Sequence, residues 1–414
     1  MTAGVARDYA KSRVLKVVSG DDEEAEASLR RETGIRIAQT LGELKGAAMK
    51  VGQMASAAKD LVPVEVADAL AVLQKEAPPI DYEIIAEQIE KELGSPPELL
   101  FQSFDREPFA AASVGQVHRA RTDDGVEVVV KVQYPGVDLA VDSDLDQVRF
   151  ALKMGGVLRM PQDMVDAMFE EMRERLHEEL DYCNEADNVR LFRAYHAMHD
   201  HIVVPDVIGE RSAQRVLTLT YEPGLSLQEM VDKPKELRDT LATNLTRMIV
   251  DQLFELNWIH GDPNPANFAF REDGRVVIYD FGCVKHMTPE MVEGVRVLLH
   301  AAKYRNYAEM DAALITLGPL RPEGAPLEPR YYERWLKAMA GPLYVDGPFD
   351  FGSANIGEDL LRLMPSTMKR MHRFQPAPEL GILDREVAGL YDIARALKAH
   401  VALGPMLVPH IDAR

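Results

Sequence analysis

The stretch His260-Gly261-Asp262-Pro263-Asn264-Pro265-Ala266-Asn267, followed further along by Asp280-Phe281-Gly282, decides the fold of this chain. Two short apolar runs, Phe268 to Phe270 and Val276 to Tyr279, separate the two motifs and flank an Asp273-Gly274 turn. This pattern predicts a β-hairpin. Because a hairpin brings its two ends together, the polar residues before and after it are expected to converge.

Asp262 and Asn267 precede the hairpin, and Asp280 follows it. Oxygen ligands without His or Cys suit Mg²⁺, which keeps several waters and takes phosphate as a further ligand. The step from Asp262 to Asn267 also matches the protein-kinase catalytic loop. There the Asp accepts a hydroxyl proton, while the Asn and the later Asp-Phe-Gly aspartate hold the metals. His260 is expected to be a structural hydrogen-bonding residue, and a helix over Leu241 to Leu256 is expected to lead into the loop.

Composition indicates a globular protein that is not a general nucleic-acid binder. The 414 residues are enough for two lobes, with 46% hydrophobic and 28% charged residues. A net charge of −20 opposes binding to nucleic-acid phosphates, and to anionic membranes unless a local basic patch exists. Two cysteines, Cys183 and Cys283, favour a reducing cytoplasm and are expected to be buried thiols. No apolar run is long enough to span a bilayer.

A helical extension is predicted for residues 1–95, with helices including Val64 to Lys75 and Asp81 to Leu93. It contains Lys50-Val51-Gly52-Gln53. A glycine inside a helix costs about 1 kcal/mol relative to alanine, so Gly52 indicates close approach of its backbone to another surface. Considered alone, tight helix packing explains this glycine equally well.

A β-rich section follows, in which a strand beyond Pro108 turns at Asp124-Gly125 and returns over Val126 to Val132. Lys131 lies in the part of that strand predicted to be buried, so it needs a carboxylate or a phosphate nearby. A kinase-like fold supplies both, because its third strand carries a lysine that contacts phosphates and pairs with a helix glutamate. A lysine that reaches solvent at a strand edge is the alternative.

The loop before this strand differs from a glycine-rich phosphate loop. Ala110, Ala111, Ala112 and Ser113 stand where glycines are usual, and Gly115 is the one glycine. Each Cβ restricts positive φ and crowds the backbone. We therefore expect a stiffer loop that holds a triphosphate differently.

Candidate partners for Lys131 lie on a long helix that is predicted to begin near Pro161. They are Glu178, Glu179, Asp181 and Glu185. Charged residues on a helix usually form a solvated face, but this segment ends the apolar stripe, which favours a functional role.

The remainder is predicted to be mainly helical from Leu237 onward, after strands over 202–207 and 215–220 and a hinge at 221–224. No other His, Cys or carboxylate group has metal-ligand spacing. The segment 360–373 combines the apolar residues Leu360, Leu361, Met364, Met368 and Met371 with the basic residues Arg362, Lys369, Arg370 and Arg373. A basic amphipathic surface is one interpretation, and we favour a core-facing helix with a solvated side.

Together these motifs resemble the UbiB-like family, the aarF-domain or ADCK atypical kinases, over roughly residues 30 to 300. Lys50 to Gln53 corresponds to the K-x-G-Q signature, Ala110 to His118 to the alanine-rich loop, and Glu179 to Asp181 to the E-x-D motif. Lys131 matches the nucleotide lysine. His260 to Asn267 resembles H-x-D-P-H-P-G-N and is followed by the Asp-Phe-Gly motif.

Two positions depart from the family pattern: Asn264 stands where His is usual, and Ala266 where Gly is usual. The metal-binding and proton-accepting positions remain, so nucleotide chemistry is expected and only the loop geometry is in question. Many members carry a membrane anchor, which this chain is expected to lack.

The resemblance implies an α+β, two-lobed protein-kinase-like fold with a helical N-terminal extension packed over the active site. The extension spans residues 1–95, an N-lobe with a helical insertion spans 96–220, and a mainly helical C-lobe spans 221–414. Members resemble one another in binding Mg–nucleotide and in ATPase activity that responds to lipids or phenolic compounds. They are linked to isoprenoid quinone biosynthesis, and protein phosphorylation is generally not their established activity.

The resemblance also implies a role for each site residue. Asp262 and Lys131 are expected to be catalytic, and Asn267 and Asp280 to bind Mg²⁺. The residues expected to regulate access to the site are Lys50, Gly52, Gln53, Glu179, Asp181 and Glu185. Those expected to contact ATP are Ala110, Ala111, Ala112, Ser113, Val114, Gly115, Lys131 and Glu222.

We therefore expect a cytoplasmic, Mg²⁺-dependent ATPase or small-molecule kinase-like protein that uses ATP or ADP and supports quinone or lipid metabolism. One alternative is a true protein kinase, which the missing conventional substrate segment after Gly282 opposes. Another is a nucleotide-gated scaffold without turnover, which the intact Asp262 opposes. A lipid, a phenolic quinone precursor and peripheral membrane contact stay open as partners.

Overall fold

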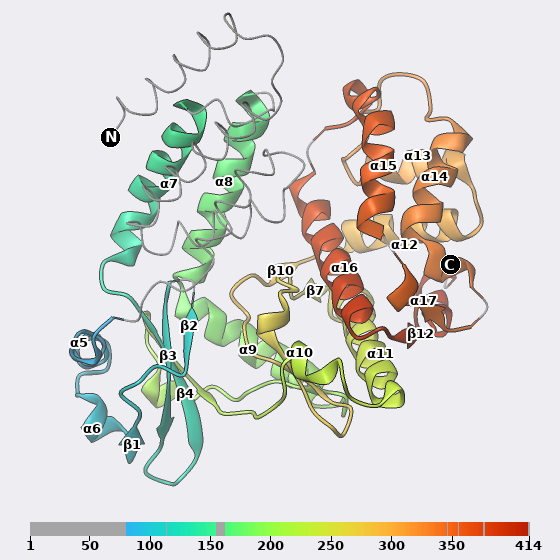
Figure 1. The fold of residues 1–414 in the computed structure, drawn as a ribbon. Helices are drawn as coiled ribbons and strands as arrows, with labels where there is room; N and C mark the ends of the chain where they lie inside the picture. Colours follow the sequence, from blue (N-terminus) through green and yellow to red (C-terminus); the bar gives the residue numbers. More distant parts are fainter. Residues whose placement is uncertain are drawn as a thin grey trace, which may run out of the picture. The chain divides into compact units, whose positions relative to one another are not determined.

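The computed structural model describes residues 80–412, apart from 113, 155–161, 346, 355 and 376 (Figure 1). Most of the predicted extension therefore lies outside the described residues, including Lys50, Gly52 and Gln53. The described chain forms two compact units. The first comprises residues 80–187 and 206–221, and the second comprises 188–205 and 222–412.

The first unit is built on an antiparallel sheet in the strand order β1-β3-β4-β6, with β2 paired to β3. Its strands are β1 (Ser103–Phe104), β2 (Ala110–Ala112), β3 (Gly115–Arg121), β4 (Glu127–Gln133) and β6 (Val216–Thr220). Its helices are α5 (Tyr82–Leu93), α6 (Pro97–Leu100), α7 (Val137–Met154), α8 (Gln162–Glu179) and the first part of α9 (Tyr182–His196).

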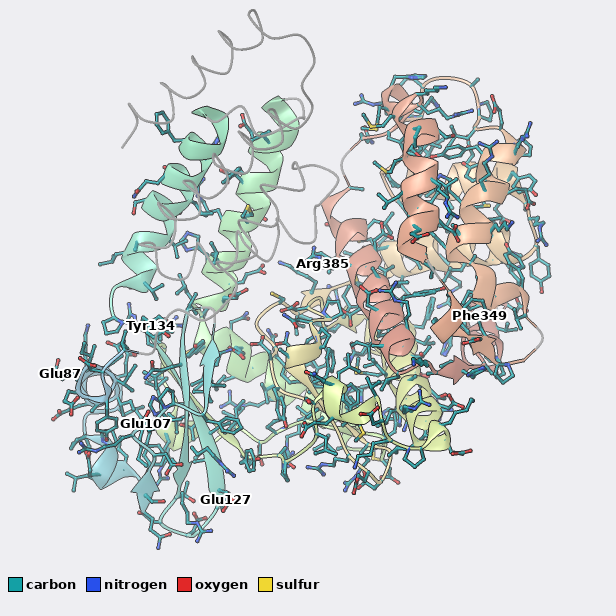
Figure 2. All side chains as sticks on the ribbon, in the orientation of Figure 1. Glu87, Glu107, Glu127, Tyr134, Phe349 and Arg385 are labelled. Carbon is teal, nitrogen blue, oxygen red and sulfur yellow. The ribbon has the colours of Figure 1, made fainter. Side chains whose placement is uncertain are left out.

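The predicted hairpin around Asp124-Gly125 is confirmed, with β3 and β4 paired from Gly115↔Gln133 to Arg121↔Glu127. Figure 2 shows Glu127 near the turn, where its carboxylate forms ion pairs with Arg119 and Arg121. Gly125 adopts a φ of 87°, which a glycine tolerates without steric cost.

Helix α5 covers one face of this sheet. Ile85 and Ile89 of the helix pack against Val128, Val130 and Val132 of β4 in one buried cluster. Because side chains alternate between the faces of a strand, Lys131 lies on the opposite face.

Three local predictions for the first unit are wrong. The alanine stretch Ala110–Ala112 is not a loop but strand β2, paired with β3 down to Ala112↔Gly115. The helix expected to run on beyond Leu180 is instead two helices, because α8 ends at Glu179 and α9 begins at Tyr182. Cys183, in the first turn of α9, is exposed rather than buried.

The second unit is mainly helical, as predicted. Its helices are the rest of α9, α10 (Leu227–Met230), α11 (Lys235–Asp251), α12 (Pro289–Lys303), α13 (Tyr307–Thr316), α14 (Pro329–Met339), α15 (Ile356–Met368), α16 (Pro378–Ala396) and α17 (Gly404–Ile411). Its strands are β5 (Ile202–Val203), β7 (Trp258–Ile259), β8 (Phe268–Phe270), β9 (Val276–Ile278), β10 (Lys285–His286), β11 (Phe349–Asp350) and β12 (His400–Val401).

Strands β8 and β9 form the predicted hairpin, and β5 pairs with β9 in parallel. All six hairpin residues are buried. Gly274 in the turn has a φ of 89°, as the Asp-Gly signal predicts. The hairpin therefore anchors the segments on both of its sides in the interior of the unit.

Helix α15 agrees only in part with the prediction of a core-facing helix. Leu363 is buried, but Leu361 and Met368 are 46% and 60% exposed. Met371, in the 3₁₀ turn that follows, is also exposed. The helix thus presents apolar as well as basic side chains to solvent.

Candidate catalytic loop and nucleotide lysine

The catalytic loop is introduced by α11, which continues as a π-helical turn over Gln252–Leu256. Asn257 then ends the helical segment with a left-handed φ of 60°, a conformation that asparagine tolerates better than most residues. The chain next forms β7, which pairs with β10 through Ile259↔Lys285. This short ladder aligns the residues just after β7 with those just before β10.

Gly261 is required in this alignment for two reasons. Its φ is 79°, and a Cβ at this position would lie 2.4 Å from the carbonyl oxygen of Cys283. Real Cβ atoms do not approach a backbone oxygen so closely, so any other residue would push the two strands apart. The glycine before Asp262 is therefore a packing requirement of the loop.

His260 connects the catalytic loop to the Asp-Phe-Gly motif. Its ring is fully buried, and Nε2 donates to the backbone carbonyl of Asp280. Phe281, also fully buried, packs edge-on against His260 with ring centroids 5.5 Å apart. The backbone carbonyl of Phe281 accepts a hydrogen bond of 3.0 Å from Asn188 Nδ2. His260 thus has the structural hydrogen-bonding contact expected of it.

Asp262 and Asn267 are joined directly. Asn267 Nδ2 donates to Asp262 Oδ2 at 2.9 Å and to its backbone carbonyl at 3.2 Å. Since the amide nitrogen of Asn267 is committed to Asp262, its amide oxygen is the atom of this side chain that can act as a cation ligand. Asp280 Oδ1 accepts from Gly282 N–H at 3.0 Å, which fixes this carboxylate at the end of the hairpin. An all-oxygen donor set of this kind fits Mg²⁺.

Asn264, one of the two departures from the family pattern, has a clear local role. Its Oδ1 accepts from Ala266 N–H at 3.0 Å and caps the 3₁₀ turn Pro265–Asn267. Asparagine is among the best capping residues because its short side chain reaches the backbone N–H groups of the following turn. This cap holds the turn that delivers Asn267.

Helix α16 supplies two residues that sequence reasoning missed. Glu386 is fully buried and accepts a hydrogen bond of 3.0 Å from Gly261 N–H. Desolvation raises the pKa of its carboxyl, and nearby His260 opposes that rise. One turn later, a Cβ on Gly389 would lie 2.3 Å from the Pro263 ring. The sequence offered one indication of these contacts: Glu386 and Gly389 interrupt an otherwise apolar face of the helix. No local pattern indicated that they contact the loop at Gly261 and Pro263.

In the first unit, Lys131 pairs with Glu185. Lys131 Nζ lies 2.9 Å from both carboxylate oxygens, and the side chains are 16% and 1% exposed. The ammonium group also lies 5.0 Å from the centre of the Tyr182 ring. Removing one partner of such a buried ion pair leaves the other charge unpaired in the interior, which typically lowers the free energy of unfolding by about 3–5 kcal/mol. The pair therefore holds Lys131 in one position.

The two E-x-D residues, Glu179 and Asp181, lie where α8 ends and α9 begins. Asp181 Oδ1 accepts from Asn184 N–H at 3.0 Å and so caps α9, and it also accepts from Gln214 Nε2 at 3.2 Å. Glu179 is the last residue of α8. The backbone between them is tied to the sheet, because Gln133 Nε2 donates to the Leu180 carbonyl at 2.8 Å.

Gly115 and Glu222 complete the predicted nucleotide contacts. A Cβ on Gly115 would lie 2.1 Å from the Val132 carbonyl oxygen, so this glycine permits close pairing of β3 and β4 rather than positive φ. The Glu222 carboxylate pairs with Arg271 at 2.7 Å, and its backbone carbonyl accepts from the Tyr279 hydroxyl. Val114, between β2 and β3, is buried.

One cluster of potential metal ligands was not expected from sequence spacing. Asp251, Glu255 and His410 offer ligand atoms within 4.8 Å of one another. Asp251 and Glu255 are one helical turn apart, but His410 comes from the far end of the chain. Glu255 also accepts a hydrogen bond from the Tyr195 hydroxyl.

A strand lysine paired with a helix glutamate, and a buried His-x-Asp loop joined to an Asp-Phe-Gly motif, define a kinase-like protein. The chain belongs to the ABC1 atypical kinase-like domain family, whose model matches residues 72–314. The UbiB-like resemblance and the kinase-like fold class are thereby confirmed.

Similar proteins agree with this assignment. The chain is 31% identical to "Atypical kinase coq-8, mitochondrial" of Caenorhabditis elegans, covering 89% of this chain and 49% of that protein. It is 30% identical to "Atypical kinase COQ8B, mitochondrial" of Danio rerio, covering 91% and 61%. The chain thus spans about half of the length of the curated relatives it matches.

A solved structure is similar over nearly the whole chain. It is described as the complex of Rv3197 with erythromycin from Mycobacterium tuberculosis. Sequence identity is 30%, the TM-score is 0.64, and the match covers 94% of this chain and 98% of that one. Within the described part of this chain, no helix has the length and apolar character needed to cross a bilayer.

Proposed function

We propose that this protein is a Mg²⁺-dependent, ATP-binding atypical kinase or ATPase that supports isoprenoid quinone or lipid metabolism. The observation that carries the proposal is the Asp262–Asn267 hydrogen bond, in a loop joined by His260 to the backbone of Asp280. This arrangement prepares two oxygen ligands and one proton acceptor. The kinase-like domain implies ATP binding, and the COQ8 names of the relatives support the metabolic assignment.

Each residue then has a defined task. Lys131 binds the ATP phosphates, and Glu185 keeps its ammonium group in position. Asn267 and Asp280 hold Mg²⁺, which supplies neutralisation of the charge that develops on the phosphates. Asp262 orients the attacking hydroxyl or water and accepts its proton. Glu179 and Asp181, together with Lys50, Gly52 and Gln53, regulate access to the site.

The proposal is tested by following the labelled γ-phosphate of ATP with purified full-length chain and Mg²⁺. Wild type is expected to release label mainly as inorganic phosphate or to transfer it to a small phenolic acceptor. Asp280→Asn should abolish Mg²⁺-dependent ATP binding, because it removes a ligand charge. Asp262→Asn should retain binding and lose at least about a hundredfold in turnover, the usual contribution of a positioned acid or base.

Three results would contradict this function. Unchanged Mg²⁺-dependent binding in Asp280→Asn would reject the metal assignment. Label found on an added protein would support a protein kinase instead. Nucleotide binding without any turnover in wild type would support a scaffold. Asp273→Asn, in the exposed hairpin turn, is the control for Asp262→Asn and Asp280→Asn because it makes the same charge change.

A further inference from the structure

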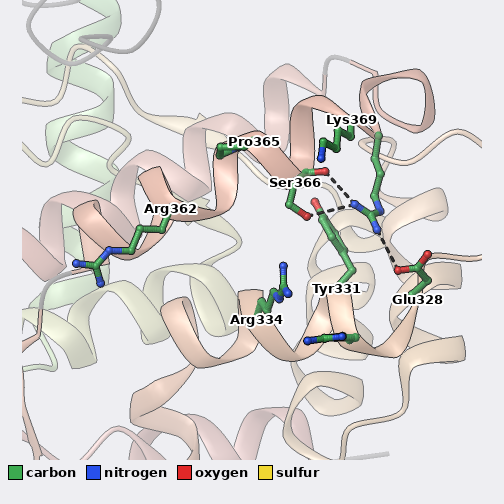
Figure 3. A pocket seen from close by; sticks show the side chains of 9 residues that line it. Glu328, Tyr331, Arg334, Arg362, Pro365, Ser366 and Lys369 are labelled. Atoms are coloured by element: carbon green, nitrogen blue, oxygen red, sulfur yellow. Dashed lines mark hydrogen bonds and ion pairs between the residues drawn. The ribbon is translucent and has the colours of Figure 1, made fainter.

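A basic pocket lies between α14 and α15 in the second unit, away from the catalytic loop in sequence. Its volume is about 460 Å³. Five cationic side chains line it: Arg330, Arg334, Arg362, Lys369 and Arg370. In Figure 3, Arg334 points from α14 toward α15, where Ser366 and Lys369 lie.

Most of the positive charge in this pocket is not neutralised. Arg370 pairs with Glu328, the only acidic residue in the lining, at 3.0 Å. Arg362 pairs with Glu358 and Asp359 on its own helix. Arg330, Arg334 and Lys369 have no ion-pair partner among the residues that the structure describes. In a chain with a net charge of −20, such a concentration of cations favours an anionic ligand.

An apolar cavity adjoins the basic pocket. Its volume is about 510 Å³, and it is lined almost entirely by aliphatic and aromatic side chains from α11, α12, α14, α16 and α17. They include Leu253, Val295, Leu336, Leu383, Val387 and Leu407. The volume is enough for a hydrocarbon chain, and the polar part of the lining is limited to Thr246, Thr367, Asp384 and the polar ends of the tyrosines and Trp335.

The two hollows meet at one residue. Tyr331 lines both, and its hydroxyl lies 3.2 Å from Thr367 Oγ1. On α15, Ser366 lines the basic pocket and the next residue, Thr367, lines the cavity. On α14, Arg334 lines the pocket and the next residue, Trp335, lines the cavity. On each helix, one of two adjacent residues thus lines the basic pocket and the other lines the apolar cavity.

We propose that pocket and cavity form one binding site for an amphiphile with a phosphate head group. The head group binds to Arg330, Arg334 and Lys369, because guanidinium groups donate in a bidentate manner to phosphate. The hydrocarbon chain occupies the apolar cavity. This site goes beyond the proposed nucleotide chemistry and uses none of its residues.

Trp335 makes the proposal directly measurable. The chain has two tryptophans, and Trp258, in β7, does not line the cavity. In full-length chain carrying Trp258→Phe, fluorescence reports Trp335 alone. Monomeric dodecyl phosphate should change this emission saturably. Affinity should rise about fourfold for each added methylene from octyl to dodecyl phosphate, from about 0.8 kcal/mol per buried CH₂.

Two further probes separate head group from chain. Dodecanol, which lacks the phosphate, and inorganic phosphate, which lacks the chain, should each bind at least about tenfold more weakly than dodecyl phosphate, since each loses one set of contacts. If dodecanol binds equally well, the basic pocket takes no part. If inorganic phosphate binds equally well, the cavity takes no part. Either result would overturn the proposal.

Matched variants test the residues. Arg330→Gln combined with Arg334→Gln should weaken dodecyl phosphate at least tenfold and leave dodecanol unchanged. Lys337→Gln, an exposed charge on the same helix outside the pocket, should change neither. Val387→Phe should fill the cavity and weaken both long-chain probes, and its melting temperature shows whether it is folded. Wild-type affinity in the arginine double variant would refute the site.

Vesicles then identify the source of the head group. Flotation with phosphatidylcholine vesicles is compared with vesicles that also contain phosphatidic acid. Binding only to the anionic vesicles, and its loss in the arginine double variant, assigns the site to a membrane lipid. Binding of monomeric dodecyl phosphate without vesicle flotation assigns it to a free amphiphile. Failure of both probes contradicts the proposal, while ATP turnover is measured separately and tests only the proposed function.

Discussion

At the scale of single residues, Gly261 shows how packing constrains the catalytic loop. Its neighbours act through their side chains, since His260 donates to the Asp280 carbonyl and Asp262 is the proposed proton acceptor, whereas Gly261 has no side chain. It is needed because β7 and β10 bring the Cys283 carbonyl to within 2.4 Å of the position a Cβ would take. The loop geometry therefore depends on the absence of a side chain at this position.

Gly261→Ala is expected to destabilise the fold by about 1–3 kcal/mol or more, since it adds a steric clash to a strained positive φ. It should also reduce ATP turnover, because the clash displaces Asp262. Urea unfolding and steady-state ATPase assays measure both effects. Gly357→Ala is the matched control. Among the described residues no atom lies within 4 Å of a Cβ built on Gly357, which is in α15, so alanine should stabilise by about 0.5–1 kcal/mol. Equal effects of the two substitutions would refute this account.

At the scale of elements, α16 supports the catalytic loop from one face and lines the apolar cavity with another. Glu386 and Gly389 contact Gly261 and Pro263. Leu383, Asp384 and Val387 line the cavity. The positions on the two faces alternate at helical spacing, so one rigid element contacts both sites.

Glu386→Ala is expected to leave the buried Gly261 N–H without an acceptor, which costs about 1–3 kcal/mol. Glu386→Gln retains an acceptor oxygen of the same reach and should restore most of the stability and turnover. Thermal unfolding and the ATPase rate are the measurements, with exposed Glu379→Gln on the same helix as the control. A positioning role requires rescue by glutamine. If Glu386→Gln is as impaired as Glu386→Ala, the carboxylate charge itself is essential and the positioning interpretation is wrong.

At the scale of the whole molecule, buried ionisable groups link folding to pH. Desolvation lowers the pKa of His196 to about 3 and that of His201 to about 4, from an ordinary value of 6.5. Desolvation at the cavity wall raises the pKa of Asp384 to about 6. The two histidines and the aspartate therefore act in opposite directions over the same pH range.

The sign for the histidines follows from proton linkage. Between pH 6.5 and about 4 the unfolded chain binds protons that folded His196 and His201 do not, so acid lowers their contribution to stability. Because the pKa of Asp384 is raised in the folded chain, folded Asp384 binds a proton below about pH 6 that the unfolded chain does not yet bind. Its contribution to the free energy of unfolding therefore grows as the pH falls below about 6. The contribution of His196 is therefore isolated by comparing variants rather than by the pH slope of wild type alone.

His196→Gln is expected to reduce the loss of unfolding free energy between pH 7.5 and pH 5, whatever its effect on absolute stability. Urea unfolding at both pH values measures the difference. Exposed His372→Gln should leave that difference as in wild type. An unchanged pH difference in His196→Gln would show that this ring does not carry the acid sensitivity.

The sequence by itself determined the two hairpins that carry the candidate site residues. The β8–β9 hairpin follows from alternating apolar runs around Asp273-Gly274, and the β3–β4 hairpin from those around Asp124-Gly125. Strand periodicity and turn chemistry are local, so they can be interpreted without a structure. The spacing from Asp262 to Asn267 and the Asp-Phe-Gly motif placed the candidate metal ligands for the same reason.

Only the tertiary structure decided which distant groups meet. Glu178, Glu179, Asp181 and Glu185 were all candidate partners for Lys131, and in the structure the Glu185 carboxylate lies 2.9 Å from the Lys131 ammonium group, just after the break between α8 and α9. Ala110–Ala112 became a strand because β3 offers it a partner. Glu386, the basic pocket and the apolar cavity likewise arise from contacts between helices far apart in the chain. Such contacts depend on packing, which no local pattern encodes.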